Sequence, residues 1–251
     1  MKRKWIRWVS WILLTPIILF VILMVLLYVP PVQNLLRREV TAYASKVTGM
    51  QIQVERIDLR FPLNLLVRGV EVIQQPDTLL SLESLNVRVQ AWPLIKGKVE
   101  VDEVTLSRVA VNSADLMEGM KIKGVLGRFF LQSHGVDLSN ELAVINQVEL
   151  SDTHMQLLMN DTTTTPKDTT ASAPINWKVA LHQLKLKNVS FGMQLPADSM
   201  RMTAHIGEAA INNAQADLKN QYYDLKKFLL SGTSASYDTG TAQPTEGFDA
   251  S

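Results

Sequence analysis

The apolar residues of segment 101–111, VDEVTLSRVAV, are spaced 3, 2, 3 and 2 positions apart. A regular half-buried strand alternates with a period of two, and an amphipathic helix steps by three and four. Each polar pair in this segment shifts the alternation by one residue, which would turn the following side chains to the other face of a sheet. A β-bulge or corner at each pair returns the apolar set to one face and bends the strand. The segment therefore predicts a curved strand with one apolar face.

The same rhythm recurs along the chain. It is found in VERIDL (54–59), INQVELSDTHM (145–155) and LHQLKLKNVSF (181–191), and a looser copy, IGEAAINNAQA, begins at Ile206. Coincidence is the alternative, because strands of any β protein contain such hexamers. Four good copies favour a true repeat, at intervals that are irregular but within the range of solenoid-like architectures. We expect each copy to add one curved strand to an elongated apolar trough.

From Met50 onward the chain consists of short runs rich in Val, Leu and Ile, bounded by Pro, Gly and Asn. Runs of this kind at intervals near ten residues are typical of an antiparallel sheet. The predicted fold class is mainly β: a transmembrane helix and a short amphipathic helix, followed by an elongated, curved, repeat-built antiparallel sheet that forms a groove. Residues 214–230 are compatible with either a helix or a strand.

The N-terminal region has the pattern of a membrane anchor. Trp11 to Val29 is a run of nineteen residues without a charge, which as a helix would span about 28 Å, close to the hydrocarbon thickness of a bilayer. Lys and Arg residues precede the run, so the N-terminus is expected in the cytoplasm and the remainder outside it. A cleaved signal peptide is the alternative, but the run is long and no A-x-A-like cleavage site follows. The anchor residues that we single out are Trp11, Pro16, Phe20 and Tyr28.

The chain divides into six predicted segments. Residues 1–30 form a cytoplasmic stub and the anchor, and 31–49 an amphipathic helix ended by Gly49. This helix is predicted to be a lid on the β-structure, with a position on the membrane surface as the alternative. A first β-groove section covers 50–159, a disordered Thr-rich insertion 160–174 and a second β-groove section 175–230. Residues 231–251 are predicted to be a polar tail, and because no capping unit precedes it, we expect the chain to be the N-terminal piece of something longer.

Composition and motifs give no support for catalysis. The 251 residues carry a net charge of +1 and include no cysteine, so disulfides and thiolate metal sites are excluded. There is no basic stripe that would favour a nucleic-acid partner. The four histidines lack metal-ligand spacing, and neither a phosphate-binding loop nor a nucleophile elbow occurs. We therefore predict no catalytic residue, no metal, no cofactor and no enzyme activity.

The order of these features resembles the AsmA-like superfamily and, within it, the N-terminal region of the TamB family. The resemblance rests on the anchor, on PPVQNLLRREVTAYASKVTGMQIQVERIDL, and on LLVRGVEVIQQPDTLLSLESLNVRVQAWPLIKGKVEVDEVTLSRVAV. TamB chains are several times longer and end in a domain that this sequence lacks. Segments such as 77–79 and 198–200 also resemble the O-glycosylation signal of Bacteroidetes periplasmic proteins, which agrees with an exported location.

The resemblance implies a β-groove that crosses the periplasm from an inner-membrane anchor and carries phospholipid between the membranes. It also implies an outer-membrane barrel protein of the assembly family as a partner. An apolar trough suits such a role, because an acyl chain of sixteen carbons costs on the order of 12 kcal/mol to expose to water. The predicted lipid-lining residues are Val87, Val89, Val101, Val104, Leu106, Val109 and Val111. From sequence alone they could equally form the core of a closed sandwich. A scaffold module that binds assembly partners through its sheet edges is the alternative function.

Overall fold

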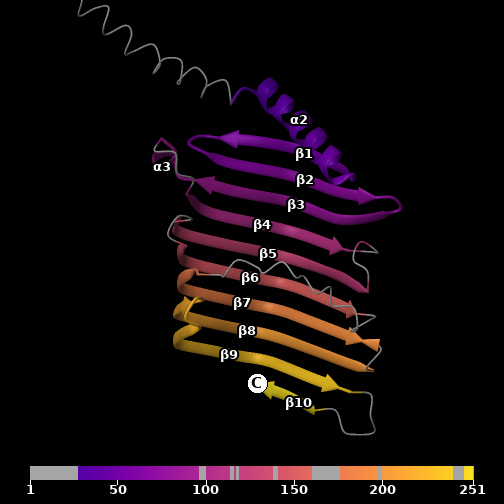
Figure 1. The fold of residues 1–251 in the computed structure, drawn as a ribbon, viewed down its shortest axis with the longest axis vertical. Coiled ribbons are helices and arrows are strands. Elements are labelled where there is room, and N and C mark those ends of the chain that lie inside the picture. Colours follow the sequence, from indigo (N-terminus) through magenta and orange to yellow (C-terminus); the bar gives the residue numbers. More distant parts are fainter. Residues whose placement is uncertain are drawn as a thin grey trace, which may run out of the picture.

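The structure is a computed structural model that describes residues 28–95, 100–113, 116, 119–137, 141–159, 176–196, 199–239 and 246–250. One ten-stranded sheet dominates it, and the strands follow one another in sequence order (Figure 1). The strands are β1 (Gln51–Arg60), β2 (Asn64–Gln74), β3 (Asp77–Val89), β4 (Val101–Asn112), β5 (Met120–Asp137), β6 (Leu142–Met159), β7 (Lys178–Leu195), β8 (Met200–Asp217), β9 (Tyr222–Asp238) and β10 (Glu246–Ala250). The predicted mainly β class is confirmed.

The sheet differs from the expected purely antiparallel arrangement at one place. Eight of its nine neighbouring pairs are antiparallel, but β6 and β7 run parallel, with Leu142 opposite Lys178 and Leu150 opposite Leu186. A parallel pair needs a connection that returns to the starting end of the sheet. The connecting residues 160–177 include the Thr-rich insertion, whose predicted disorder lies outside the described residues.

A line of corners crosses the sheet where the sequence places the second polar pair of the repeats in β4, β6 and β7. One position on each strand from β1 to β9 is skipped by the pairing ladder, and these positions lie opposite one another. Five of them have a positive φ, between 47° and 58°. The skipped residues are Glu55, Gly69, Glu83, Arg108, Gly127, Asp152, Asn188, Gly207 and Gly232. The register is the same on both sides of this line, so these positions are corners without an inserted residue, and the predicted bends are confirmed here.

The first polar pairs of the repeats in β4, β6 and β7 form a second line of irregular pairing, which continues at the second pair of the looser copy in β8. The register shifts at Asp102, and the ladder skips Asn146, His182 and Asn213, the last with a φ of 56°. Each long strand therefore consists of three extended stretches joined by two corners. The predicted effect of the polar pairs is confirmed at both positions in the repeat.

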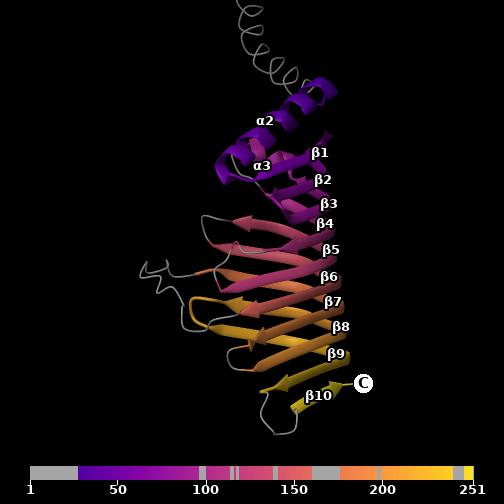
Figure 2. The ribbon, with the colours of Figure 1, turned by 90° about the vertical axis from the view of Figure 1, so that its right-hand side faces the viewer.

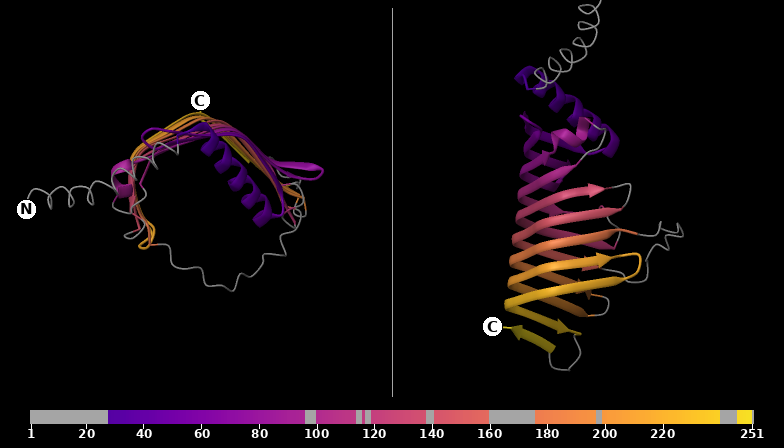
Figure 3. Two further views of the ribbon diagram at one scale, coloured as in Figure 1. Left: turned by 90° about the horizontal axis from the view of Figure 1, so that it is seen from above. Right: turned by 90° about the vertical axis from the view of Figure 1, so that its left-hand side faces the viewer.

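Because the corners are aligned from strand to strand, the whole sheet curves into a trough. Figure 3 shows this curve from above, and Figure 2 shows the strands stacked along the long axis. The ten-stranded sheet is not closed and has a single layer. Among the described residues, buried apolar side chains are accordingly few and scattered, such as Leu82 on β3 and Ala209 on β8. In the described part of the chain this is an open curved sheet, not the closed sandwich that the sequence left as an alternative.

The predicted amphipathic helix is α2 (Pro30–Thr48), which begins with two prolines and ends at Gly49 with a φ of 69°. It lies against the outer edge of β1, inside the curve of the sheet (Figure 3). Its side chains bond to the backbone of that edge: the Gln33 amide donates to the Leu59 carbonyl (2.9 Å) and the Arg37 guanidinium to the Glu55 carbonyl (2.8 Å). Ser45 Oγ accepts from the Ile52 N–H at 3.1 Å. The helix therefore shields an edge strand that would otherwise be free to pair with another chain.

One part of the lid prediction is wrong. We expected the apolar side of α2 to pack on the β-structure, but the contact uses polar residues, and Leu35, Val40, Tyr43 and Val47 are exposed. The reason is that β1 offers an edge of unpaired backbone groups, which polar side chains satisfy and apolar ones do not. A second, short helix, α3 (Ala91–Ile95), lies between β3 and β4.

The C-terminal region differs from its prediction. Residues 214–230 belong to β8 and β9 and to the turn between them, and not to a helix. The predicted polar tail contains the second half of β9 and all of β10, which pair from Tyr237 opposite Glu246 to Thr233 opposite Ala250. No helix within the described ranges is long and apolar enough to cross a membrane, and the predicted anchor falls outside them up to residue 27.

Candidate lipid-binding trough

Rows of apolar side chains run across the strands on one face of the sheet. Directly opposed residues share a face, and the pairing carries one such row from β1 to β9. Its members are Ile57, Val67, Leu85, Leu106, Phe129, Leu150, Leu186, Ala209 and Leu230. The adjacent row consists of Leu59, Leu65, Val87, Val104, Leu131, Val148, Leu184, Ile211 and Phe228. Within β1–β9 these two rows contain no polar side chain.

The corner lines keep this face apolar on both sides of each bend. Beyond the corner at Arg108, the next row pairs Leu82 with Val109, and the following row pairs Leu80 with Val111. All seven predicted lining residues lie on this face, in adjoining rows of β3 and β4. The structure thus brings the predicted set together as one surface.

The apolar face lies on the inside of the curve. No second layer covers it in the described structure, yet its side chains are half-buried, as Val109 and Val111 are, while Arg108 before them and Ala110 between them are exposed. Side chains on the inside of a curved sheet converge and shield one another, whereas those on the outside diverge. The rows therefore form the lining of the trough.

Charged side chains are held on the opposite, outer face. Arg88 and Glu103 form an ion pair at 3.2 Å across β3 and β4, and Arg108 pairs with Glu83 at the corner. The Asn188 amide donates to Asp152 Oδ1 at 2.8 Å, which joins β7 to β6 at the same corner line. These contacts range from part-buried, at Glu103, to exposed, and they pair charges on the outer face and not on the apolar rows.

Sequence reasoning did not find the contribution of β5 to the lining, whereas the repeats that lie in β6, β7 and β8 predict that these strands extend the trough. Phe129 and Leu131 of β5 stand directly opposite Leu106 and Val104, but their strand lacks the polar-pair rhythm. Gly127 occupies the corner position of β5 instead. A Cβ atom there would lie 2.7 Å from Asp152 Cβ and 2.8 Å from the Asp152 carbonyl oxygen. A lone glycine between apolar residues was the available signal, since an isolated glycine in a strand often marks a bulge or a close backbone approach.

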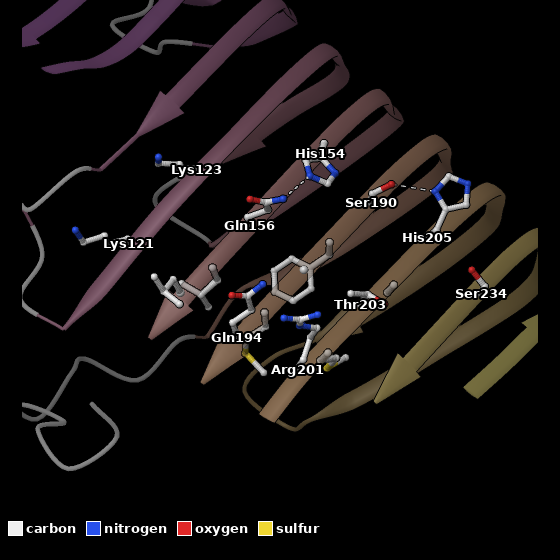
Figure 4. A pocket seen from close by; sticks show the side chains of 17 residues that line it. Lys121, Lys123, His154, Gln156, Ser190, Gln194, Arg201, Thr203, His205 and Ser234 are labelled. Carbon is white, nitrogen blue, oxygen red and sulfur yellow. Dashed lines mark hydrogen bonds between the residues drawn. The ribbon is translucent and has the colours of Figure 1, made fainter. Parts of the chain in front are cut away.

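A separate hollow of about 510 Å³ lies over β5–β9 (Figure 4). Its polar lining comes from the outer face, because His154, Ser190, His205 and Ser234 are mutually opposed and alternate with the apolar rows. Ser190 Oγ and His205 Nδ1 are 2.9 Å apart. Among the described residues no carboxylate lines the hollow, so within that part of the chain the pair lacks the third member that orients a catalytic histidine. None of the predicted lipid-lining residues belongs to it.

The remaining predictions concern ligands and the anchor. Among the described residues no group of three or more His, Asp or Glu side chains is placed to hold a metal ion. Tyr28 is described, whereas Trp11, Pro16 and Phe20 lie outside the described residues.

Comparison with known proteins finds no family model that matches the chain, and no curated protein matches its sequence.

Proposed function

We propose that the protein is an inner-membrane-anchored segment of a lipid conduit, which shields phospholipid acyl chains in its trough during transport between inner and outer membranes. The observation that carries the proposal is the pair of uninterrupted apolar rows on the inside of an open sheet. At about 4.8 Å per strand, the rows across nine strands are about 38 Å long. This is a continuous apolar path and not an isolated pocket.

The physical chemistry of the rows suits an acyl chain. Burying a chain of sixteen carbons removes a cost on the order of 12 kcal/mol, at about 0.8 kcal/mol per methylene. Such burial is non-directional and requires no specific polar partner, which agrees with the absence of polar side chains from both rows. The proposal includes membership of the AsmA-like superfamily, a periplasmic position for residues after the anchor, and no enzymatic step.

Lipid retained on purification tests this proposal. The full chain would be extracted from membranes in mild detergent, and phospholipid per protein would be measured for the unmodified chain and for two variants. Leu106→Asp places a charge in the middle of a row, whereas Thr105→Asp places the same charge on the outer face, opposite Asn86 and Phe130. We expect Leu106→Asp to lose bound lipid and Thr105→Asp to keep it. Equal retention by both variants would contradict the proposal.

The scaffold function is a second candidate because the C-terminal end of the sheet, at β9 and β10, leaves part of a strand edge unpaired. β10 pairs only with residues 233–237 of β9, so residues 222–232 have no outer strand partner within the described structure. Large apolar side chains near this edge are exposed, among them Tyr223, Leu225 and Leu229. An extended segment of an outer-membrane assembly barrel protein could add to this edge. Substitutions there would abolish partner capture and leave lipid retention intact if the scaffold role were the principal one.

A further inference from the structure

The N-terminal end of the trough carries a group of exposed apolar side chains that the fold does not use. On α2, Val40, Tyr43 and Val47 recur at spacings of three and four, so they form one stripe, with Leu35 beside it. Tyr43 is 71% exposed. The contact with β1 runs along the adjoining side of the helix, through Gln33, Arg37 and Ser45, and leaves the side chains of the stripe exposed. The stripe is therefore not a lid contact.

Two exposed aromatic residues belong to the same end of the sheet. Phe61 lies in the β1–β2 turn and is 85% exposed, and Trp92 lies in α3 and is 71% exposed. The two are brought to one side because the Val89 N–H, at the end of β3, donates to the Leu63 carbonyl of that turn at 3.0 Å. Large aromatic side chains exposed at the end of one sheet are typical of a surface that meets a membrane interface.

The predicted anchor ends at this place. Tyr28 is the penultimate residue of the uncharged run, its hydroxyl donates to the Pro62 carbonyl at 2.7 Å, and its ring contacts the Phe61 ring at a centroid distance of 6.5 Å. α2 starts two residues later at Pro30. The connection is thus too short to separate α2 and the β1–β2 turn from the end of a membrane span. An amphipathic helix in that position lies with its apolar side about 5–10 Å deep in the headgroup region.

We infer that Leu35, Val40, Tyr43, Val47, Phe61 and Trp92 form a docking rim that seats the β1 end of the trough on the surface of the phospholipid bilayer. This inference rests on the proposed function, since it takes the anchor as membrane-embedded. It adds a specific arrangement: the bilayer surface meets the end of the apolar rows, so that an acyl chain can pass from one to the other without crossing water. Gln33 and Arg37, which bond to β1, fix the angle at which the trough stands on the membrane.

Tryptophan fluorescence tests the rim in the intact chain. The five tryptophans are Trp5, Trp8, Trp11, Trp92 and Trp177. A chain that retains only Trp92, the others being Phe, would be reconstituted in phosphatidylcholine vesicles with or without bromine on the acyl chains. We expect bromine to remove about half or more of the Trp92 emission, because the rim reaches the acyl boundary. The matched control retains only Trp177, at the start of β7, and its emission should not change.

Spin labels provide a second measurement on α2, which the absence of cysteine in the chain makes straightforward. Nitroxides at Val47→Cys and Tyr43→Cys should become more accessible to oxygen and less accessible to a water-soluble nickel complex when vesicles are present. Asn34→Cys, on the side of α2 away from the stripe, should show no such change.

The outcomes separate the rim from the conduit. Unquenched Trp92 and unchanged nitroxides in chains that float with the vesicles would overturn the rim, and the conduit would stand if Leu106→Asp still lost bound lipid. Quenching of Trp92 together with equal lipid retention by Leu106→Asp and Thr105→Asp would support the rim and overturn the conduit. Failure of the chain to float with vesicles would overturn the rim together with the anchor.

Discussion

The close approach of backbones at the corner line makes Gly127→Ala a sharp test of the fold. An added Cβ would lie 2.7 Å from Asp152 Cβ and 2.8 Å from the Asp152 carbonyl oxygen, both part of the neighbouring strand. Ordinary carbon contacts are about 3.5–4.0 Å, so β5 and β6 would have to move apart at the corner. Overpacking of this kind costs about 1–3 kcal/mol, and the lower chain entropy of alanine offsets about 0.4–1 kcal/mol. A net loss of about 1–2 kcal/mol is therefore expected.

Urea unfolding followed by far-ultraviolet circular dichroism measures this loss on the full chain in detergent. A loss of about 1–2 kcal/mol should lower the urea midpoint by roughly 0.5–1 M. The matched control is Gly192→Ala on β7, where an added Cβ would meet only Gln156 Cγ, at 3.9 Å. That variant should be neutral or slightly more stable. If both alanine variants shifted the midpoint equally, the corner would not require a glycine at position 127, and the reasoning would be refuted.

Two further predictions concern single side chains. Asn188 has a φ of 52°, and its side-chain amide donates to Asp152. Asn188→Val should therefore lower the free energy of unfolding by about 2–3 kcal/mol and Asn188→Gly by about 1 kcal/mol, measured from urea midpoints. Equal losses in the two variants would exclude the backbone conformation as the cause. The backbone N–H of Asn220, and then its side-chain amide, hold the pKa of Asp217 below its usual value. A folded-state pKa below the unfolded-state pKa stabilises the folded turn at pH values above the unfolded-state pKa. This stabilisation is lost as the pH falls through the folded-state pKa. Asn220→Ala should raise the Asp217 pKa in an NMR titration, and an unchanged value would contradict the assignment.

Much of the architecture could be read from side-chain patterning, because curvature in this sheet is encoded locally. The pairs Ser107–Arg108, Ser151–Asp152 and Lys187–Asn188 shift the apolar alternation, and the structure has a positive-φ residue at the second position of each. The helix boundaries were also predictable, from Pro30 at the start and Gly49 at the end. These features depend on steric and periodic constraints that a single residue or pair imposes.

Features that depend on the backbone ladder could not be predicted in the same way. The parallel pairing of β6 with β7 leaves no trace in alternation, because a strand presents the same pattern in either direction. The second half of β9 and β10 contain few apolar residues, but their backbone groups pair with neighbouring strands, as in Phe248 opposite Ala235. Any residue except proline offers those groups, so a polar composition does not exclude a strand.

The exposed stripe on α2 was predicted as apolar but assigned to the wrong contact. Periodicity identifies an apolar side of a helix and does not identify what covers it. The edge of β1 selected Gln33, Arg37 and Ser45 because its unpaired carbonyls and N–H groups need hydrogen bonds. A prediction that counted the backbone groups of the first strand would have found this.

Photocrosslinking tests the central claim most directly. A benzophenone amino acid would replace Val104 or Leu106 of the membrane-anchored chain, and Thr105 would serve as the control on the outer face. The account predicts phospholipid adducts at 104 and 106 and none at 105. Crosslinks within the protein at 104 and 106, without lipid at any of the three positions, would contradict an open lipid-carrying trough.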